Sequence, residues 1–315
     1  MKTLLMFATL GSITFFCLGC TNNSQSVGLN GVGIITENNS DQLINLKNYK
    51  SMGFPHEHIL QAHFINQSTI GLLMQNGTTF KLLTQNTFSS VRTYNLSFNA
   101  VSFCPYKVDD IMFLSIDRLE KLNLTTGNIQ SYPLGYVAQD ISCFSSISTI
   151  VLINIKKAIL YLFSTVSNLT YLVKQLPFSF VSYFIPPNFQ AVYFVAPDLK
   201  QIFIMSLLNF TYPQPIKLPS KLISYAINNY YYFAYLLASS GHKIFVLNLL
   251  TGNLLGTIYT DNPYTTIISA PSNIVIAYYK GSSSLQIYKI DGISELNWLG
   301  SLNVEIPFWN FQLIT

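Results

Sequence analysis

The sequence carries little charge, and that charge forms no runs. Only 10% of the 315 residues are charged, and 17 basic residues against 13 acidic ones give a net charge of +4. The chain therefore lacks the clustered basic segment with which proteins hold a phosphate backbone. We expect no nucleic acid among its partners.

Long apolar runs and reaction motifs are missing as well. Beyond residue 20, no apolar stretch reaches the roughly 18 residues of a membrane-spanning helix. There is no Gly-x-Ser-x-Gly nucleophile motif and no glycine-rich phosphate loop after a predicted strand. The 3.6-residue apolar spacing of helical repeats is also missing. We expect no catalytic residues, no cofactor and no enzymatic activity.

The first residues have the composition of an export signal. Lys2 precedes an apolar run from Leu4 to Phe16, which ends at Cys17-Leu18-Gly19-Cys20. This ending resembles a bacterial lipoprotein signal, although Cys17 stands where a leucine is usual. The resemblance implies cleavage after Gly19 and a lipid on Cys20. A plain secretory signal is the alternative.

The polar stretch after Cys20 is typical of a tether. The resemblance makes residues 1–19 the signal peptide and residues 20–30 a lipidated flexible segment. It also implies transport to the outer membrane, because Thr21 rather than aspartate follows the lipidated cysteine. The remaining chain would be anchored there, on either the periplasmic or the cell-surface side.

The rest of the chain is rich in residues that favour strands. Half of the residues are hydrophobic, and 23 are Phe and 20 are Tyr. The clearest unit is Lys243–Tyr259, which reads as two strands joined by a turn at Thr251-Gly252-Asn253. Glycine and asparagine tolerate the positive φ of such turns. The stretch therefore predicts a β-hairpin.

Variants of the first strand of this hairpin recur along the chain. Seven such segments end at Leu46, Leu83, Leu124, Phe163, Leu207, Leu249 and Ile290. A spacing of roughly 40–45 residues, with room for four strands in each unit, is typical of β-propeller blades. The second and third strands of each unit are continuous apolar runs, as expected for strands covered on both faces.

The two ends of the repeat predict a closed ring. The first unit starts at GVGIIT (31–36), which has the character of a second strand, and IPFWNFQLI (306–314) is left over after the last unit. Pairing these two segments would complete blade one and remove the open sheet edges. We expect an all-β, seven-bladed β-propeller over residues 31–315, with six or eight blades as alternatives.

The repeats resemble the broad family of WD40, YVTN and PQQ-type propellers, covering about residues 31–315. Thr126-Gly127-Asn128 and Thr251-Gly252-Asn253 are the closest matches, while the Trp-Asp and Gly-His pairs of true WD40 repeats are missing. Lipoproteins with such propellers include non-catalytic subunits of outer-membrane assembly and secretion complexes. The resemblance implies a protein–protein scaffold whose partners are envelope proteins, bound to the outer membrane through the lipid.

Two alternatives to a scaffold stay open. One is a propeller enzyme or carbohydrate-binding module of the lactonase or glycan-active type, which would gather carboxylates, histidines or a metal at the channel mouth. The predicted innermost strands offer one carboxylate, Asp140, and one imidazole, His63. The other alternative is a surface-displayed protein that contacts a host.

Three histidines form a weak candidate metal site. His56 and His58 share a face of an extended segment, and His63 follows on the way into blade two. Such a cluster is able to ligate zinc, but the spacing matches no known metal motif. We expect a solvated loop and no metal.

Cys104 and Cys143 hold equivalent positions on neighbouring innermost strands, each 20 residues before its repeat anchor. A disulfide requires Cα atoms within about 7 Å. Because neighbouring blades are usually spaced slightly further apart, we expect two buried free thiols, with a disulfide between the blades as the alternative.

One charged neighbourhood remains. It consists of Asp109, Asp110, Asp117, Arg118 and Glu120. Paired carboxylates serve acid–base chemistry or bind calcium. Here they fall at the two ends of the predicted blade three, and we expect solvated turn residues.

Overall fold

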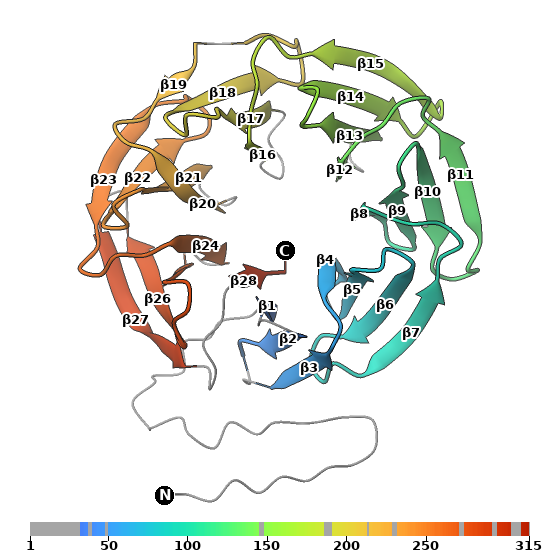
Figure 1. Ribbon diagram of the computed structural model, residues 1–315, viewed down its shortest axis with the longest axis horizontal. Coiled ribbons are helices and arrows are strands. Elements are labelled where there is room, and N and C mark those ends of the chain that lie inside the picture. Colours follow the sequence, from blue (N-terminus) through green and yellow to red (C-terminus); the bar gives the residue numbers. More distant parts are fainter. Residues whose placement is uncertain are drawn as a thin grey trace, which may run out of the picture.

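The computed structural model shows seven four-stranded antiparallel sheets arranged as blades around an axis (Figure 1). It describes residues 32–36, 40–47, 50–144, 148–185, 191–212, 214–228, 232–270, 274–291, 295–303 and 310–314. The predicted signal peptide, Cys20 and the tether lie outside these residues. The described part of the chain has no helix long and apolar enough to cross a membrane. The prediction of an all-β, seven-bladed propeller is confirmed.

Each blade runs from an innermost strand at the axis to an outermost strand at the rim. Blade one consists of β28 (Asn310–Leu313), β1 (Val32–Thr36), β2 (Ser40–Asn45) and β3 (Ser51–Pro55). Blade two has β4 (Ile59–Asn66), β5 (Thr69–Met74), β6 (Thr79–Thr84) and β7 (Ser90–Asn95). Blade three has β8 (Ser102–Lys107), β9 (Asp110–Leu114), β10 (Arg118–Asn123) and β11 (Ile129–Pro133).

The other four blades follow the same order. Blade four has β12 (Asp140–Phe144), β13 (Thr149–Asn154), β14 (Ile159–Ser164) and β15 (Leu169–Gln175). Blade five has β16 (Ser182–Phe184), β17 (Ala191–Val195), β18 (Gln201–Ser206) and β19 (Ile216–Lys217). Blade six has β20 (Leu222–Asn228), β21 (Phe233–Ala238), β22 (Lys243–Asn248) and β23 (Leu254–Tyr259). Blade seven has β24 (Thr266–Ala270), β25 (Ile274–Tyr278), β26 (Ser284–Asp291) and β27 (Glu295–Asn303).

The ring closes through blade one, as the sequence predicts. β28 pairs with β1 from Gly33 opposite Leu313 to Thr36 opposite Asn310. The Phe311 ring lies directly over Gly33, where an added Cβ would come within 2.2 Å of it. Glycine at position 33 therefore makes room for the aromatic ring that closes the sheet.

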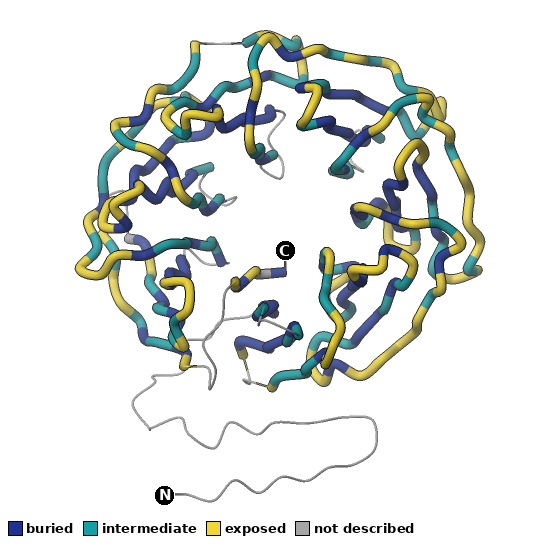
Figure 2. Tube along the Cα trace, viewed as in Figure 1, coloured by how far each residue is buried: buried dark blue, intermediate teal, exposed yellow. Residues whose placement is uncertain are grey.

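Burial follows position within the blade (Figure 2). The second strands β13, β17 and β25 are buried at every residue, because neighbouring blades cover both faces. The outermost strand β15 instead alternates between exposed and half-buried residues. β19 is only two residues long and begins directly after Pro215, which has no N–H to give to a strand ladder.

The hairpin turns have a shared chemistry. In blade six, Asn248 Oδ1 accepts hydrogen bonds from the N–H groups of Leu250 and Thr251, and Gly252 has a φ of 73°. In blade three, Asn123 Oδ1 accepts from Thr126 N–H and Gly127 has a φ of 76°. An asparagine at the end of the third strand and a glycine in the turn therefore fix both hairpins.

The strand directions give the ring two distinct ends. The turns from third to fourth strands lie at one end, which we call the turn face, and Val32 at the start of β1 also lies there, opposite the end of β28. The turns from second to third strands and the connections between blades lie at the other end, which we call the connection face.

We expect Phe311→Ala to weaken ring closure strongly. The Phe311 side chain is 2% exposed, so its loss would lower the free energy of unfolding by about 3–5 kcal/mol. Val166→Ala, at a side chain that is 79% exposed, is the matched control. Urea unfolding followed by fluorescence measures both, and equal stabilities of the two variants would contradict the closure described here.

Candidate functional site

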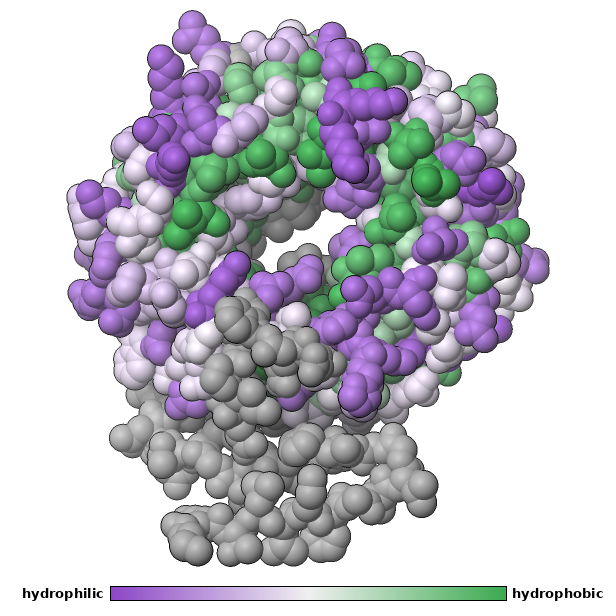
Figure 3. Space-filling model, in the orientation of Figure 1, coloured by the Kyte–Doolittle hydropathy of each residue, from purple (hydrophilic) through white to green (hydrophobic). Residues whose placement is uncertain are grey.

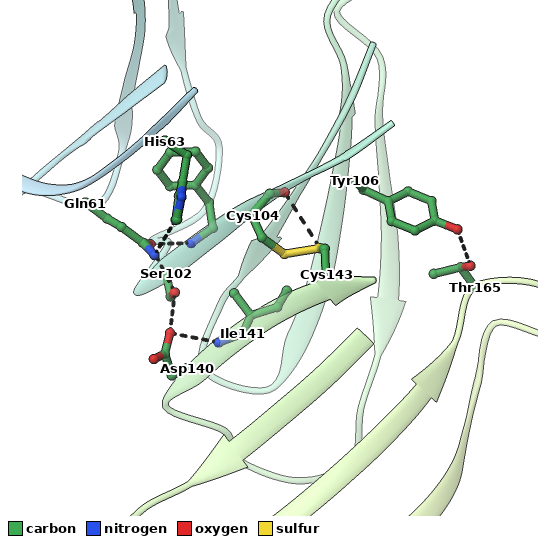
Figure 4. The surroundings of a disulfide bond; sticks show 10 residues. Gln61, His63, Ser102, Cys104, Tyr106, Asp140, Ile141, Cys143 and Thr165 are labelled. Carbon is green, nitrogen blue, oxygen red and sulfur yellow. Dashed lines mark hydrogen bonds between the residues drawn. A yellow bond between two sulfur atoms is a disulfide. The ribbon is translucent and has the colours of Figure 1, made fainter. Parts of the chain in front are cut away.

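A chain of hydrogen bonds links the innermost strands of blades two to five around the axis (Figure 4). On β4, the amide oxygen of Gln61 accepts from Phe103 N–H at 2.7 Å and lies 3.0 Å from Ser102 Oγ. Ser102 on β8 donates to Asp140 Oδ1 on β12 at 2.7 Å. The links continue outside this view, where Tyr183 on β16 donates to Asp140 Oδ2 at 2.5 Å.

Asp140 is the centre of this network. Its Oδ1 also accepts from Ile141 N–H at 2.8 Å, so the carboxylate has three donors from three different elements. Charge-assisted hydrogen bonds of this kind are stronger than neutral ones. Asp140, which the sequence singles out as a candidate for chemistry, thus serves to hold three blades together.

The tyrosines on this wall stay protonated at physiological pH. Burial, and then the neighbouring Asp140 carboxylate, raise the pKa of Tyr183 well above its usual range. Burial also raises the pKa of Tyr225, whose hydroxyl donates to the Tyr183 carbonyl at 3.1 Å. Both hydroxyls therefore act as hydrogen-bond donors between blades.

Ser102, His63 and Asp140 contain the groups of a hydrolase triad but not its geometry. Ser102 donates to Asp140 rather than to an imidazole. His63 Nε2 instead lies 2.9 Å from Gln61 Nε2, and its ring packs edge-on against Phe103. In place of the serine–histidine hydrogen bond that activates a nucleophile, the serine bonds to the next blade and the histidine bonds within its own strand.

The three candidate histidines do not come together. His56 is exposed in the connection to blade two with a φ of 61°. His58 Nδ1 lies 3.3 Å from Asp41 Oδ1, a carboxylate that is 2% exposed. His63 stands in the strand that lines the channel. Among the described residues, no group of three potential metal ligands forms.

Cys104 and Cys143 are joined in a disulfide, with Cα atoms 5.8 Å apart (Figure 4). The expectation of two free thiols is therefore wrong, and the alternative is the arrangement found. The physical reason is position: β8 and β12 are innermost strands, and blades lie nearest one another close to the axis. The bond fastens blade three to blade four beside the Asp140 network.

The charged neighbourhood of blade three is divided as expected. Asp110, at the turn face, accepts a hydrogen bond from Asn123 Nδ2 at 3.0 Å. Asp117 pairs with its neighbour Arg118 at 3.0 Å at the connection face. Glu120, by contrast, is only 4% exposed, and burial raises the pKa of its carboxyl, which accepts from Ser131 Oγ. The expectation of a solvated turn is wrong for Glu120.

In addition to the polar network, the described residues form two hollows. One of about 430 Å³ opens on the channel between Ser182, Ser224, Tyr225, Thr266, Asn310 and Gln312. A groove of about 860 Å³ lies between blades five and six on the turn face. Leu208 and Leu250 flank it, 74% and 58% exposed. Ile204 and Ile216 also line it, and a Cβ added at Gly252 would lie 3.4 Å from the first and 3.8 Å from the second.

The contributions of Gln61, Ser102 and Tyr183 to the network are not evident from the sequence. Ser102 and Tyr183 are 81 positions apart, and nothing in the sequence sets them apart from the many other serines and tyrosines of the chain. Ser102 and Asp140 do stand at the first positions of their innermost strands. Aligning the repeats on these strands is the one sequence signal that would bring such residues together.

Solved structures share this architecture. Apo AztD from Citrobacter koseri superposes with a TM-score of 0.63 at 12% identity, covering 90% of this chain and 97% of that one. The dihydro-heme d1 dehydrogenase NirN in complex with DHE gives 0.61 at 12% identity, with coverage of 91% and 66%. The β-propeller domain of Cps50 (Swd1) from Myceliophteria thermophila gives 0.62 at 10% identity, with coverage of 89% and 100%.

The chain folds as a β-propeller. At these identities the likeness shows the fold alone. No family model matches the sequence, and neither does any curated protein. Function must therefore be argued from the residues of this chain.

We expect the disulfide to form in the purified protein and to stabilise the ring. It closes a loop with a sequence separation of 39, so its loss in Cys104→Ala/Cys143→Ala should cost about 4 kcal/mol by the chain-entropy model. Intact mass before and after reduction tests the bond itself, and no increase of about two mass units would contradict it.

Tyr183→Phe should destabilise the protein by about 1–3 kcal/mol, because Asp140 Oδ2 loses its hydroxyl donor in a partly buried site. Tyr279→Phe, at a side chain that is 57% exposed, is the control and should stay within about 0.5 kcal/mol of the parent. Chemical denaturation measures both. A Tyr183 variant as stable as the control would remove the network's structural role.

Proposed function

We propose that the protein is a non-catalytic, lipid-anchored β-propeller that serves as a protein–protein scaffold in a bacterial envelope complex. The observation that carries the proposal is the use of the channel residues. Asp140, Ser102 and Gln61 are engaged in hydrogen bonds between blades and in no nucleophile–base pair. The centre of the ring thus maintains a rigid platform.

The anchor comes from the sequence. The Cys17-Leu18-Gly19-Cys20 ending favours Cys20 as the lipidated residue, and Thr21 favours the outer membrane as destination. Closure within residues 32–313 supports the same role, since it gives a rigid body that a polar tether of about ten residues is able to present to partners.

The test is purification of the full-length protein from detergent-solubilised envelopes of its own bacterium. We expect envelope proteins in stoichiometric amounts and an N-terminal peptide whose mass shows acylation at Cys20. Cys20→Ala should move the protein out of the membrane fraction while leaving its fold intact. A monomer with no stoichiometric partner would overturn the scaffold, and an unmodified Cys20 would overturn the anchor.

A further inference from the structure

The net positive charge of the protein lies in three blades. Blades four to six, residues 140–259, hold seven lysines and two aspartates, whereas the whole chain has a net charge of only +4. The remaining blades are therefore close to neutral or acidic. Only Lys156 and Lys157 are adjacent, so no longer basic run marks the seven lysines: Lys156, Lys157, Lys174, Lys200, Lys217, Lys221 and Lys243.

The topology brings all seven lysines to the connection face. Lys156 and Lys157 lie in the turn between β13 and β14, and Lys200 ends the turn before β18. Lys243 opens β22, Lys217 ends β19, and both positions are at the same end of the ring. Figure 3 shows hydrophilic side chains gathered at the rim over blades four and five. Strand direction thus turns scattered lysines into one basic arc.

The positive charges of this arc are not neutralised within the described residues. Six of the seven lysines are exposed, and Lys174 is half-buried with its Nζ 5.5 Å from the centre of the Tyr212 ring. None forms an ion pair with a described carboxylate. Asp198 accepts Lys200 N–H within its own turn, and Asp140 is held by its three donors. Beyond blade six, Asp261 is the nearest acidic residue along the chain.

Apolar groups are interleaved with the lysines. Val181, before β16, and Ile223, early in β20, are 48% and 43% exposed on the connection face. Tyr259, at the end of β23, is 71% exposed, and Lys243 Nζ lies 5.6 Å from the centre of its ring. A basic surface with exposed apolar and aromatic side chains has the mixed character of an interface with an acidic, partly apolar protein segment.

The position of β1 helps to distinguish a protein from a membrane as the partner that binds the basic arc. Val32, the first described residue, starts β1 at the turn face, which is the end of the ring opposite the basic arc. In the anchored form that we propose, the tether is joined to the ring at the turn face, which favours an acidic protein over the anchoring membrane as the partner of the connection face.

We propose that the connection face of blades four to six is the docking surface for an acidic segment of a partner protein. The inference rests on the proposed scaffold function and supplies its binding face and partner chemistry. All seven charges are lysines, which act as point charges without the bidentate geometry of arginine. Such an arc suits an acidic segment with spread charge more than a single phosphate group, and its binding must weaken with salt.

The experiment compares two variants of equal net charge, each made in the full-length protein purified in non-ionic detergent. The arc variant is K156Q/K157Q/K200Q/K221Q, and the control variant is K47Q/K50Q/K107Q/K289Q, whose lysines lie at or near the turn face. All eight side chains are exposed. The probe is a short labelled peptide of alternating glutamate and serine, titrated at low and at physiological salt and followed by fluorescence anisotropy.

We expect the arc variant to bind the peptide more than about tenfold more weakly than the parent, because several attractive lysine contacts with the acidic probe are lost together. The control variant should stay within about threefold of the parent, which corresponds to less than one such contact. Equal weakening of both variants would overturn the proposal, since net charge alone would then explain binding. Phosphatidylglycerol vesicles replace the peptide in a second titration: if the parent binds them more tightly than the arc variant does while the peptide binds both alike, the face is a lipid surface and the proposal fails.

The same variants separate this inference from the proposed function. In native envelopes, the arc variant should lose the stoichiometric partner while the control variant keeps it. A partner retained by both variants leaves the scaffold standing and overturns only the docking face. A parent protein with no partner overturns the scaffold itself.

Discussion

Closure of the ring is the constraint on which the rest of the structure depends. A propeller blade buries its second and third strands only if a neighbour covers each face, and the seventh blade has a neighbour only if the first is complete. Here the last strand completes the first blade: β28 pairs with β1, and Phe311 fills the space that Gly33 leaves open. The buried strand β25 of blade seven shares one apolar cluster with Ile35 and Phe311 of blade one. Completion of blade one by four residues near the C-terminus therefore supports the core on both sides of the closure.

The axis is held by polar chemistry in addition to apolar packing. Innermost strands face a channel on one side, so they cannot bury all their side chains against other blades. Hydrogen bonds and a disulfide link these strands: Ser102 and Tyr183 donate to Asp140 from the two neighbouring blades, and Cys104 is bonded to Cys143. Because an unpaired polar group beside an apolar wall is costly, each member of the network needs its partners. This accounts for finding a serine, a histidine and an aspartate together at the axis in an arrangement that stabilises the ring.

The sequence predicts most of the fold and little of the site, for a physical reason. Strand and turn signals are local: the Asn248 side chain caps the turn two and three residues ahead, and Gly252 supplies its positive φ. The repeat spacing then carries these local signals around the ring, and the count of seven and the closure follow. Contacts between blades depend on how near the strands approach at the axis, which spacing does not encode. Two contacts are therefore seen only in three dimensions. They are the disulfide between Cys104 and Cys143, which we expected to be free thiols, and the hydrogen bond from Tyr183 to Asp140. The burial of Glu120 is a similar case, since a charged residue next to a turn reads as solvated.

The same distinction applies to electrostatics. Read along the chain, the lysines of blades four to six look dispersed, and the absence of a basic run leads us to expect no nucleic acid among the partners. Alternating strand direction, however, places every turn between second and third strands at one end of the ring. A lysine at such a turn in one blade therefore joins a lysine some 40 residues away in the next, as Lys156 and Lys200 do. The repeat architecture therefore gathers lysines that are dispersed in the sequence into one basic surface. In a protein with so few charges, an excess confined to one end of three blades is the feature that most clearly separates one surface of the ring from the others.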